Sequence, residues 1–388
     1  MMMFRRHSWR ALLVILAVAV FMWHLTVPVT SAQEEEVEDV STDEESEAKK
    51  KKKTDFVVMP IPISNPTIGT GLAVAAMYLY KIDEASPASN TMAGGLYTDT
   101  ESWAAGIKQT TYFKADRYRA NGVLGYGSFN IKFFGVGSGA GDRGKSIDIN
   151  QKGVVFIPEF FRAVTENLYA GIQYRLLQVD TTIRNLDIPD CPICDEIQDI
   201  LNNQLSVVSS GVGLLCDYDT RDNSYYPFHG TFLTMNATFV DQALGSDLDY
   251  QIYEANYSRY MELTPDHILA IGAAGRFTFG DVPIFDLCLF GMNNYLRGYV
   301  GGQYRDKMML ATQIEYRWRF YKRFGMVAFA GVGEVAPSIG EFNSENLLPS
   351  AGAGLRFMAS TENRVNISLD YAVGKDTEAV YFRIGEAF

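Results

Sequence analysis

Apolar and polar residues alternate along most of the chain from residue 55 to its end, and turn residues separate the alternating segments. Residues 364–371 are the clearest case, because the four odd-numbered positions from Val365 to Tyr371 are apolar and the four even-numbered ones are polar. A period of two residues is that of a β-strand. The pattern therefore predicts an all-β protein whose strands have one apolar and one polar face.

The connections between these segments tend to be short and long in turn. Short ones are expected at 114–117, 163–167, 265–266, 321–323 and 360–363, and longer ones at 135–145, 180–204, 280–305, 336–348 and 374–377. Bacterial outer-membrane barrels have an even strand number, short periplasmic turns and longer external loops. A soluble sandwich gives no reason for this asymmetry. The sequence thus predicts a sixteen-stranded antiparallel transmembrane β-barrel.

The sixteen strands are predicted with explicit bounds. They are 55–63, 67–80, 91–99, 102–113, 117–133, 146–159, 167–180, 205–217, 229–242, 249–262, 266–279, 306–320, 324–335, 349–359, 363–373 and 377–388. In such a barrel the apolar faces meet lipid and the polar faces line a wet interior. An even strand number places both ends of the barrel in the periplasm.

The first 54 residues have a different composition. The apolar block 11–23 follows three arginines and precedes the small residues Thr30-Ser31-Ala32, which is typical of a signal peptide cleaved after Ala32. Residues 33–54 are rich in acids and then lysines, and such a segment cannot bury a core. We expect a signal peptide at 1–32, a charged disordered linker at 33–54 and the barrel at 55–388.

Charge and motif content exclude several classes of function. The net charge is −12, and −15 once the three arginines of the signal peptide are removed, which argues against a nucleic-acid partner. Cys191 and Cys194 form a lone CxxC, for which a local disulfide in an exported chain is more plausible than a metal site. No catalytic constellation is apparent, so we expect neither an enzyme nor a cofactor.

Three segments carry a resemblance to a known family. They are Asp217–Asn223 with Tyr226–Gly230, Asn293–Tyr299, and the closing strand that ends on Phe388. Together they resemble the BamA/TamA-type outer-membrane assembly and translocation superfamily over residues 56–388. Only the charged linker precedes the first strand, so the chain resembles the branch that lacks polypeptide-transport-associated (POTRA) repeats.

The resemblance implies an external loop that folds back into the lumen. Arg297, Gly298 and Tyr299 match the family's arginine-glycine-aromatic motif, whose arginine pairs with acids on the two following strands. Glu315 matches the first acid and lies on the polar face of its strand. The second acid would fall near Gly331, which departs from the pattern, and Glu334 is the candidate replacement. A buried arginine needs such a partner, because removing one member of a buried pair costs about 3–5 kcal/mol.

The two ends of the barrel carry further candidate residues. Pro60 and Pro62 are two residues apart, so both missing N–H groups lie on the same edge of the first strand. If that edge faces the last strand, with Gly385 at the other side of the seam, the barrel is weakly closed and can open sideways. The alternative is a bulge that ends pairing. The predicted C-terminal assembly signal consists of Tyr381, Phe382, Ile384 and Phe388.

The expected function is insertion or translocation of protein or lipid at the outer membrane of a Gram-negative bacterium. The expected partners are outer-membrane lipid, the barrel-assembly machinery during biogenesis, and a protein or lipid cargo. The alternative is a passive pore or structural surface antigen that has the same scaffold and no transport activity.

Overall fold

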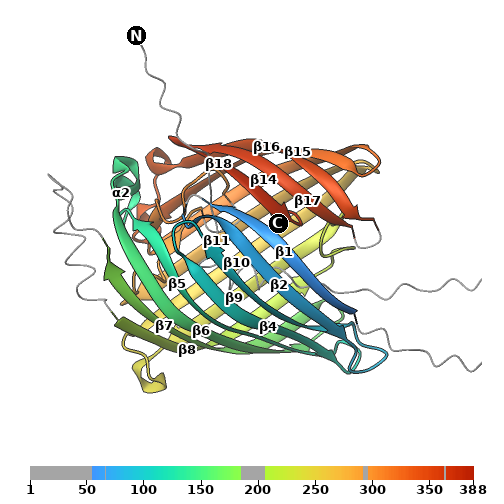
Figure 1. Ribbon diagram of the computed structural model, residues 1–388, viewed down its shortest axis with the longest axis horizontal. Coiled ribbons are helices and arrows are strands. Elements are labelled where there is room, and N and C mark those ends of the chain that lie inside the picture. Colours follow the sequence, from blue (N-terminus) through green and yellow to red (C-terminus); the bar gives the residue numbers. More distant parts are fainter. Residues whose placement is uncertain (1–54, 66, 185–205, 292–295, 362–363) are drawn as a thin grey trace, which may run out of the picture.

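The computed structural model describes residues 55–65, 67–184, 206–291, 296–361 and 364–388. Sixteen strands form one antiparallel sheet that is curved into a barrel (Figure 1). The strands are β1 (Asp55–Asn65), β2 (Gly69–Tyr80), β3 (Ser89–Thr98), β4 (Trp103–Phe113), β5 (Tyr118–Phe133), β6 (Ile147–Ala163), β7 (Leu168–Ile183), β8 (Ser206–Asp219), β9 (Gly230–Val240), β10 (Tyr250–Thr264), β11 (His267–Gly280), β14 (Met308–Tyr321), β15 (Phe324–Ala336), β16 (Leu348–Ser360), β17 (Val365–Gly374) and β18 (Thr377–Ile384). The predicted number and order of strands are confirmed.

The connection 281–307 between β11 and β14, which we name the lumen loop, folds into the barrel. It contains the short hairpin of β12 (Cys288–Leu289) and β13 (Arg305–Asp306). The helix α2 (Ser138–Arg143) lies in the connection between β5 and β6. Among the described residues, no helix is long and apolar enough to cross a membrane.

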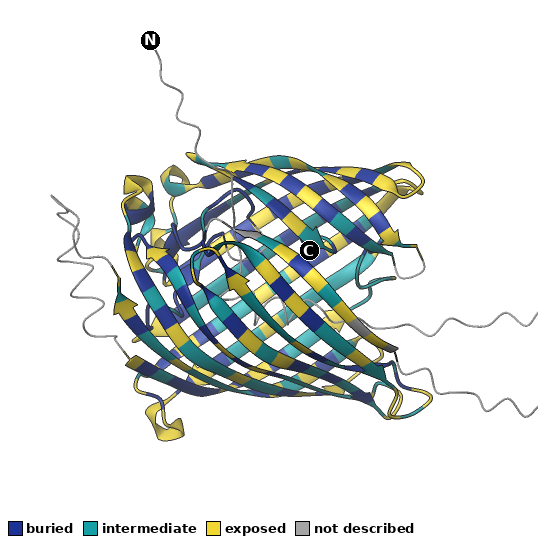
Figure 2. Cartoon of the chain, in the orientation of Figure 1, coloured by how far each residue is buried: buried dark blue, intermediate teal, exposed yellow. Residues whose placement is uncertain are grey.

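Burial alternates along the strands, as Figure 2 shows by the checkered colouring of the wall. On β14, Glu315 and Arg317 are fully buried in the lumen, whereas Ile314 and Tyr316 point outward and are 45% and 40% exposed. At least one exposed apolar or aromatic side chain lies on each of the sixteen strands of the wall. This outer surface suits lipid. The expected transmembrane barrel with one lipid-facing and one lumen-facing side is confirmed.

The pairing of neighbouring strands is continuous from β1 to β18, but the described residues contain no paired register between β1 and β18. These two strands lie beside each other, blue and red in Figure 1, and form the seam of the barrel. The last strand also stops at Ile384, four residues short of the predicted end.

Candidate functional site

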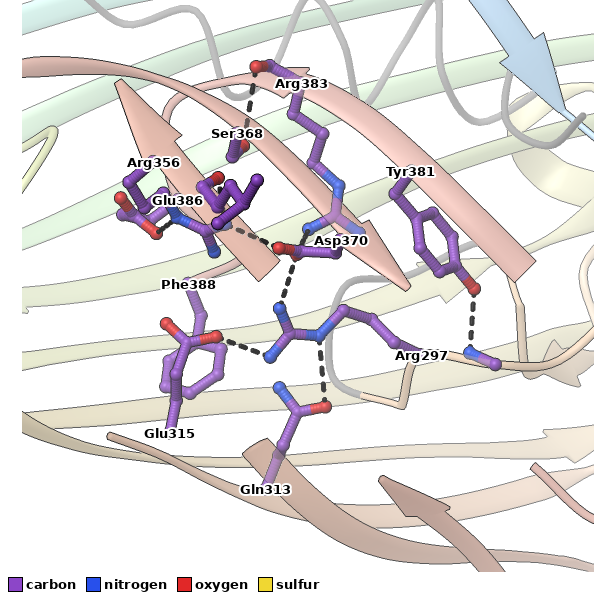
Figure 3. A network of polar contacts seen from close by, with 12 residues as sticks. Arg297, Gln313, Glu315, Arg356, Ser368, Asp370, Tyr381, Arg383, Glu386 and Phe388 are labelled. Atoms are coloured by element: carbon purple, nitrogen blue, oxygen red, sulfur yellow. Dashed lines mark hydrogen bonds and ion pairs between the residues drawn. The ribbon is translucent and has the colours of Figure 1, made fainter. Parts of the chain in front are cut away.

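Arg297 lies at the centre of the contact between the lumen loop and the barrel wall (Figure 3). Its Nη2 donates to Oε2 of Glu315 on β14 at 2.5 Å, and its Nη1 donates to Oδ2 of Asp370 on β17 at 2.7 Å. Its guanidinium lies 3.3 Å from the centre of the Phe329 ring, and the residue is 1% exposed. Hydrogen bonds between two charged groups are the strong ones. The structure therefore places Arg297 against Glu315, as the sequence predicts, and adds a second carboxylate.

That second carboxylate does not come from the strand that the sequence predicts. Asp370 belongs to β17, which follows β15 and β16 in the order of the sheet. Glu334 on β15 instead accepts a hydrogen bond from the backbone N–H of Asn343 at 2.7 Å. The expectation that Glu334 replaces the acid near Gly331 is therefore wrong. The reason is geometric, since the curved wall brings β14 and β17 to opposite sides of one guanidinium.

Two glycines of β16 make room for this arrangement. A Cβ at Gly354 would lie 1.9 Å from Oδ1 of Asp370, and a Cβ at Gly352 would lie 2.4 Å from a ring atom of Phe329. Larger residues at either position would displace the carboxylate or the ring from beneath Arg297. The missing side chains at Gly352 and Gly354 therefore leave room for the Asp370 carboxylate and the Phe329 ring.

The pair belongs to a larger group of buried charges that we name the seam cluster. Its members are Arg297, Arg317, Arg356, Arg383, Glu315, Asp370 and Glu386. Arg317 contacts Glu315 at 2.8 Å, and Arg356 contacts Asp370 at 2.5 Å and Glu386 at 2.7 Å. Four guanidinium groups thus share three side-chain carboxylates. Each carboxylate that binds Arg297 also has another arginine partner.

Gly298 fixes the course of the lumen loop beside the last two strands. Its φ is +103°, and a Cβ there would lie 2.7 Å from the backbone of Val373. Its N–H donates to the hydroxyl of Tyr381 at 2.8 Å, and its carbonyl accepts from Oγ1 of Thr377 at 2.5 Å. Only glycine combines this φ with so close an approach to another backbone. The main chain of the loop is therefore hydrogen-bonded to β18 and packed against β17, in addition to the contacts of Arg297.

Tyr299 extends the same attachment. Its side chain is fully buried, and its hydroxyl accepts the N–H of Lys375 at 3.1 Å and donates to the carbonyl of Pro349. Burial raises the pKa of Tyr299 to about 12, so the hydroxyl keeps the proton that it donates. Two residues on, the N–H of Gly301 donates to Oγ1 of Thr67 at 3.1 Å, beside the start of β2. The lumen loop therefore contacts the barrel on both sides of the seam.

A second buried cluster, which the sequence reasoning missed, holds the other part of the lumen loop. Asp286 contacts Arg175 on β7 at 2.7 Å and Arg276 on β11 at 2.9 Å, and it accepts from the hydroxyl of Tyr250 on β10 at 2.6 Å. Burial by itself raises the pKa of Asp286, but the two arginines outweigh it and the pKa is lowered. We name these four residues the wall cluster. Alternation marks Arg175 and Arg276 as lumen-facing, but no local pattern links them to Asp286.

The two prolines of β1 lie at the seam. The carbonyl of Thr70 on β2 accepts a hydrogen bond from the N–H of Asp99, directly after β3, so the even-numbered residues of β2 direct their backbone groups away from β1. Pro60 pairs with Val74 and Pro62 pairs with Leu72. Both prolines therefore turn their nitrogen atoms away from β2 and toward the edge beside β18, where neither can donate a hydrogen bond.

The last four residues leave the wall and enter the lumen. After Ile384, Gly385 has a φ of +99° and turns the chain inward. The backbone oxygen of Phe388 accepts from Nη2 of Arg317 at 2.8 Å, and its ring lies against Gly272 of β11. The prediction that the strand runs to residue 388 is therefore wrong. Alternation within Val380–Ile384 gave no sign of this turn, but glycine at 385 permits it.

The other residues of the predicted C-terminal signal divide between the two faces of β18. Phe382 points outward and is 41% exposed, whereas Tyr381 is buried against the lumen loop. Ile384 packs against the apolar cluster around Ile61 of β1. Contact across the seam therefore includes side-chain packing.

The connection 220–229 between β8 and β9 packs in the lumen at the end of the barrel that carries the short turns. Tyr226 is 5% exposed and packs with Ile268 and Met358. Asp222 accepts hydrogen bonds from the backbone N–H of Phe228 and from Arg364 on the turn before β17. Burial raises the pKa of Asp222, but the Arg364 contact and the backbone donors outweigh it and lower the pKa. This segment thus connects the turn between β8 and β9 to the turn before β17, next to the seam cluster.

Other candidate chemistry is limited. Cys191 and Cys194, the predicted disulfide, lie outside the described residues. Cys216 and Cys288 are both free thiols. Within the described part of the chain, no group of three or more His, Cys, Asp or Glu residues is arranged to hold a metal ion.

Comparison with known proteins agrees with this architecture. Residues 92–388 match the Omp85 superfamily domain. The outer membrane protein assembly factor BamA of Nitratidesulfovibrio vulgaris is 27% identical over 157 residues, which cover 36% of this chain and 20% of that protein. BamA from Haemophilus ducreyi lacking POTRA domains 1–3 has a similar fold, with a TM-score of 0.55, 14% identity and coverage of 84% of this chain and 68% of that chain. CdiB from Escherichia coli gives a TM-score of 0.57 at 11% identity, covering 85% of this chain and 62% of the other.

Fold and site together define a sixteen-stranded transmembrane barrel whose lumen is crossed by a loop pinned through a buried arginine. The family match covers most of the described residues, including both ionic clusters. The chain belongs to the Omp85 superfamily.

Proposed function

We propose that this protein inserts or translocates protein or lipid at the outer membrane of a Gram-negative bacterium, with the seam between β1 and β18 as the exit and without an enzymatic step. The observation that carries the proposal is the missing backbone pairing between these strands in the described residues. Pro60 and Pro62 weaken that edge further, since neither has an N–H to donate. Family membership supports the same reading.

Opening the barrel at the seam would break few backbone hydrogen bonds. Elsewhere in the wall, separating two strands breaks a ladder of ten or so paired residues, such as the eleven pairs between β1 and β2. At the seam the contact includes packing, for example of Ile384 on the Ile61 cluster. A substrate strand that pairs with the free edge of β1 or β18 would satisfy backbone groups that lipid leaves unsatisfied. Outer-membrane lipid, the assembly machinery that inserts this barrel, and an exported cargo are the partners in this proposal.

A disulfide lock tests the exit. Cysteine pairs scanned over 58–63 of β1 and 378–384 of β18 would join the seam, and each lock is reversible by a reductant. The matched control is Val58→Cys with Ala76→Cys, which lock β1 to its existing partner β2. We expect seam locks, but not the control lock, to reproduce the cellular defect of a strain without the protein. Full complementation by a seam-locked protein would reject the lateral exit.

The alternative is a passive pore or surface antigen. The lumen loop and the segment 220–229 both occupy the lumen, which favours a plugged barrel over an open one. In planar bilayers we expect small currents from the intact protein and large openings after deletion of 280–305. Large steady currents from the intact protein would favour the passive pore instead.

A further inference from the structure

The lumen contains a cavity that neither the seam cluster nor the proposed exit uses. Its volume is about 400 Å³, and it lies between the lumen loop and the wall formed by β4 to β11. Phe129 and Ile131 of β5 and Leu287 of the lumen loop supply part of its apolar lining. Cavities of about 300–1,000 Å³ with a mainly apolar lining and a few polar groups are typical of small-molecule sites.

Arg305 on β13 faces this cavity with an uncompensated charge. The residue is 3% exposed, its Nη1 donates to the carbonyl of Ile284 at 3.3 Å, and its guanidinium lies 4.9 Å from the ring centre of Phe133. Its Nε is buried and has no hydrogen-bond partner, and no carboxylate of the described residues lies within ion-pair distance. Burial lowers the pKa of Arg305 to about 10, so it stays protonated at neutral pH.

The other arginines of the cavity differ in this respect. Arg175 and Arg276 share Asp286, and Arg276 also lies 3.3 Å from Glu254. Their charges are compensated within the protein, so an anionic ligand gains little from them. A buried guanidinium without a carboxylate is costly. Arg305 is therefore the position at which an anionic ligand would gain most.

We propose that the cavity binds a small amphiphilic anion, with its carboxylate or phosphate head on Arg305 and its apolar part along Phe129, Ile131 and Leu287. The planar fork of arginine matches the oxygens of either head group. Because Leu287 and Arg305 belong to the lumen loop and Phe129 belongs to β5, the ligand would bridge the loop and the wall. This inference does not depend on the proposed export function.

Titration calorimetry with the full chain refolded into discs of neutral lipid tests the proposal, with empty discs as the blank. The probes are hexyl phosphate, hexanoate, hexanol and hexyltrimethylammonium, which share one tail and differ in the head group. We expect one or both anions to bind at least about tenfold more tightly than the other two, as one charged hydrogen bond allows. The preferred anion then separates a phosphate source from a fatty-acid source.

Substitution of Arg305 assigns the head-group site. We expect Arg305→Met and Arg305→Gln to weaken anion binding at least about tenfold, and Arg305→Lys to weaken it less. The exposed turn residue Arg323 provides the control Arg323→Met, which should bind like the unaltered protein. Without probe, Arg305→Met should unfold at the same or a higher urea concentration, because it removes a buried unpaired charge.

Three outcomes would overturn the proposal. They are equal binding of all four probes, anion binding that Arg305→Met and Arg305→Gln leave unchanged, and no binding of either anion. A purely structural role for Arg305 predicts the opposite stability result, a lower urea midpoint for Arg305→Met in the absence of probe.

Discussion

The lumen loop is held by two ionic clusters of opposite polarity. At the wall cluster the loop supplies the acid, Asp286, and the barrel supplies Arg175 and Arg276. At the seam cluster the loop supplies the cation, Arg297, and the barrel supplies Glu315 and Asp370. Because the two polarities are reversed, a loop placed end for end would set like charges against each other. The pair of clusters therefore specifies the direction in which the loop crosses the lumen.

The clusters also differ in how their charges are compensated. In the wall cluster one carboxylate serves two arginines. Among the described residues, the only further hydrogen-bond partner of Arg175 is the hydroxyl of Ser209 at 3.2 Å. In the seam cluster both acids that bind Arg297 keep another arginine if it is removed, namely Arg317 or Arg356. The cost of losing the loop residue should therefore be greater at the wall cluster, although the family motif lies at the seam cluster.

The largest expected effect follows from Asp286→Asn. It leaves the buried Arg175 without a carboxylate partner. We therefore expect the free energy of unfolding to fall by about 3–5 kcal/mol. Urea unfolding in lipid vesicles, followed by the gel mobility of the folded barrel, measures the change. The same variant should show large, frequent openings in planar bilayers, because the lumen loop loses its attachment to β7 and β11.

Asp281→Asn is the matched control for this variant. Asp281 lies on the same loop and is exposed, and the same substitution there should change stability by less than about 0.5 kcal/mol. Equal effects of the two variants would mean that the wall cluster does not hold the loop.

Arg297→Met should have an intermediate effect, about 1–3 kcal/mol, from the loss of two charged hydrogen bonds. The sequence alone suggests a cost of about 3–5 kcal/mol, but the remaining arginines keep Glu315 and Asp370 compensated. Arg297→Lys tests the geometry separately, because a point charge cannot bind both acids through a planar fork. A loss for Arg297→Met as large as that for Asp286→Asn would contradict the difference between the clusters.

The fold was predictable because membrane barrels repeat one simple pattern. Alternation specifies the two faces of strands such as β14 and β17, and loop lengths specify their direction. The predicted strand ends differ from the observed ones by up to four residues, at the C-terminal end of β6 and, in the opposite direction, at that of β18. There the inward turn at Gly385 depends on contacts of Glu386 and Phe388 with other strands, which no local pattern encodes.

The site was only partly predictable for the same reason. Glu315 is two residues from Gln313 and Arg317, so alternation and family resemblance together identified it. Asp370 was placed on the polar face of its strand, but its contact with Arg297 depends on barrel curvature and on the missing side chain at Gly354. The wall cluster joins residues separated by up to 111 positions, and neither spacing nor alternation reveals such a contact.

The smallest expected effect is that of a substitution at Asp222, in the segment 220–229. Asp222 carries two backbone hydrogen bonds and the contact with Arg364, which is partly exposed. Because the folded-state pKa of Asp222 is lowered, its contribution is fully present above the unfolded value of about 3.9 and is lost as the pH falls through the folded-state pKa. Asp222→Asn should therefore cost about 1 kcal/mol at pH 7 and less at pH 3.

Urea unfolding of this variant and of Asp281→Asn at the two pH values measures the difference. Among the described residues, no ion pair joins the segment 220–229 to the lumen loop, so Asp222→Asn should leave channel currents small, unlike Asp286→Asn. Large openings from Asp222→Asn would show that closure of the lumen depends on the segment 220–229 as well as on the lumen loop. The two clusters would then not be sufficient to hold the loop in the lumen.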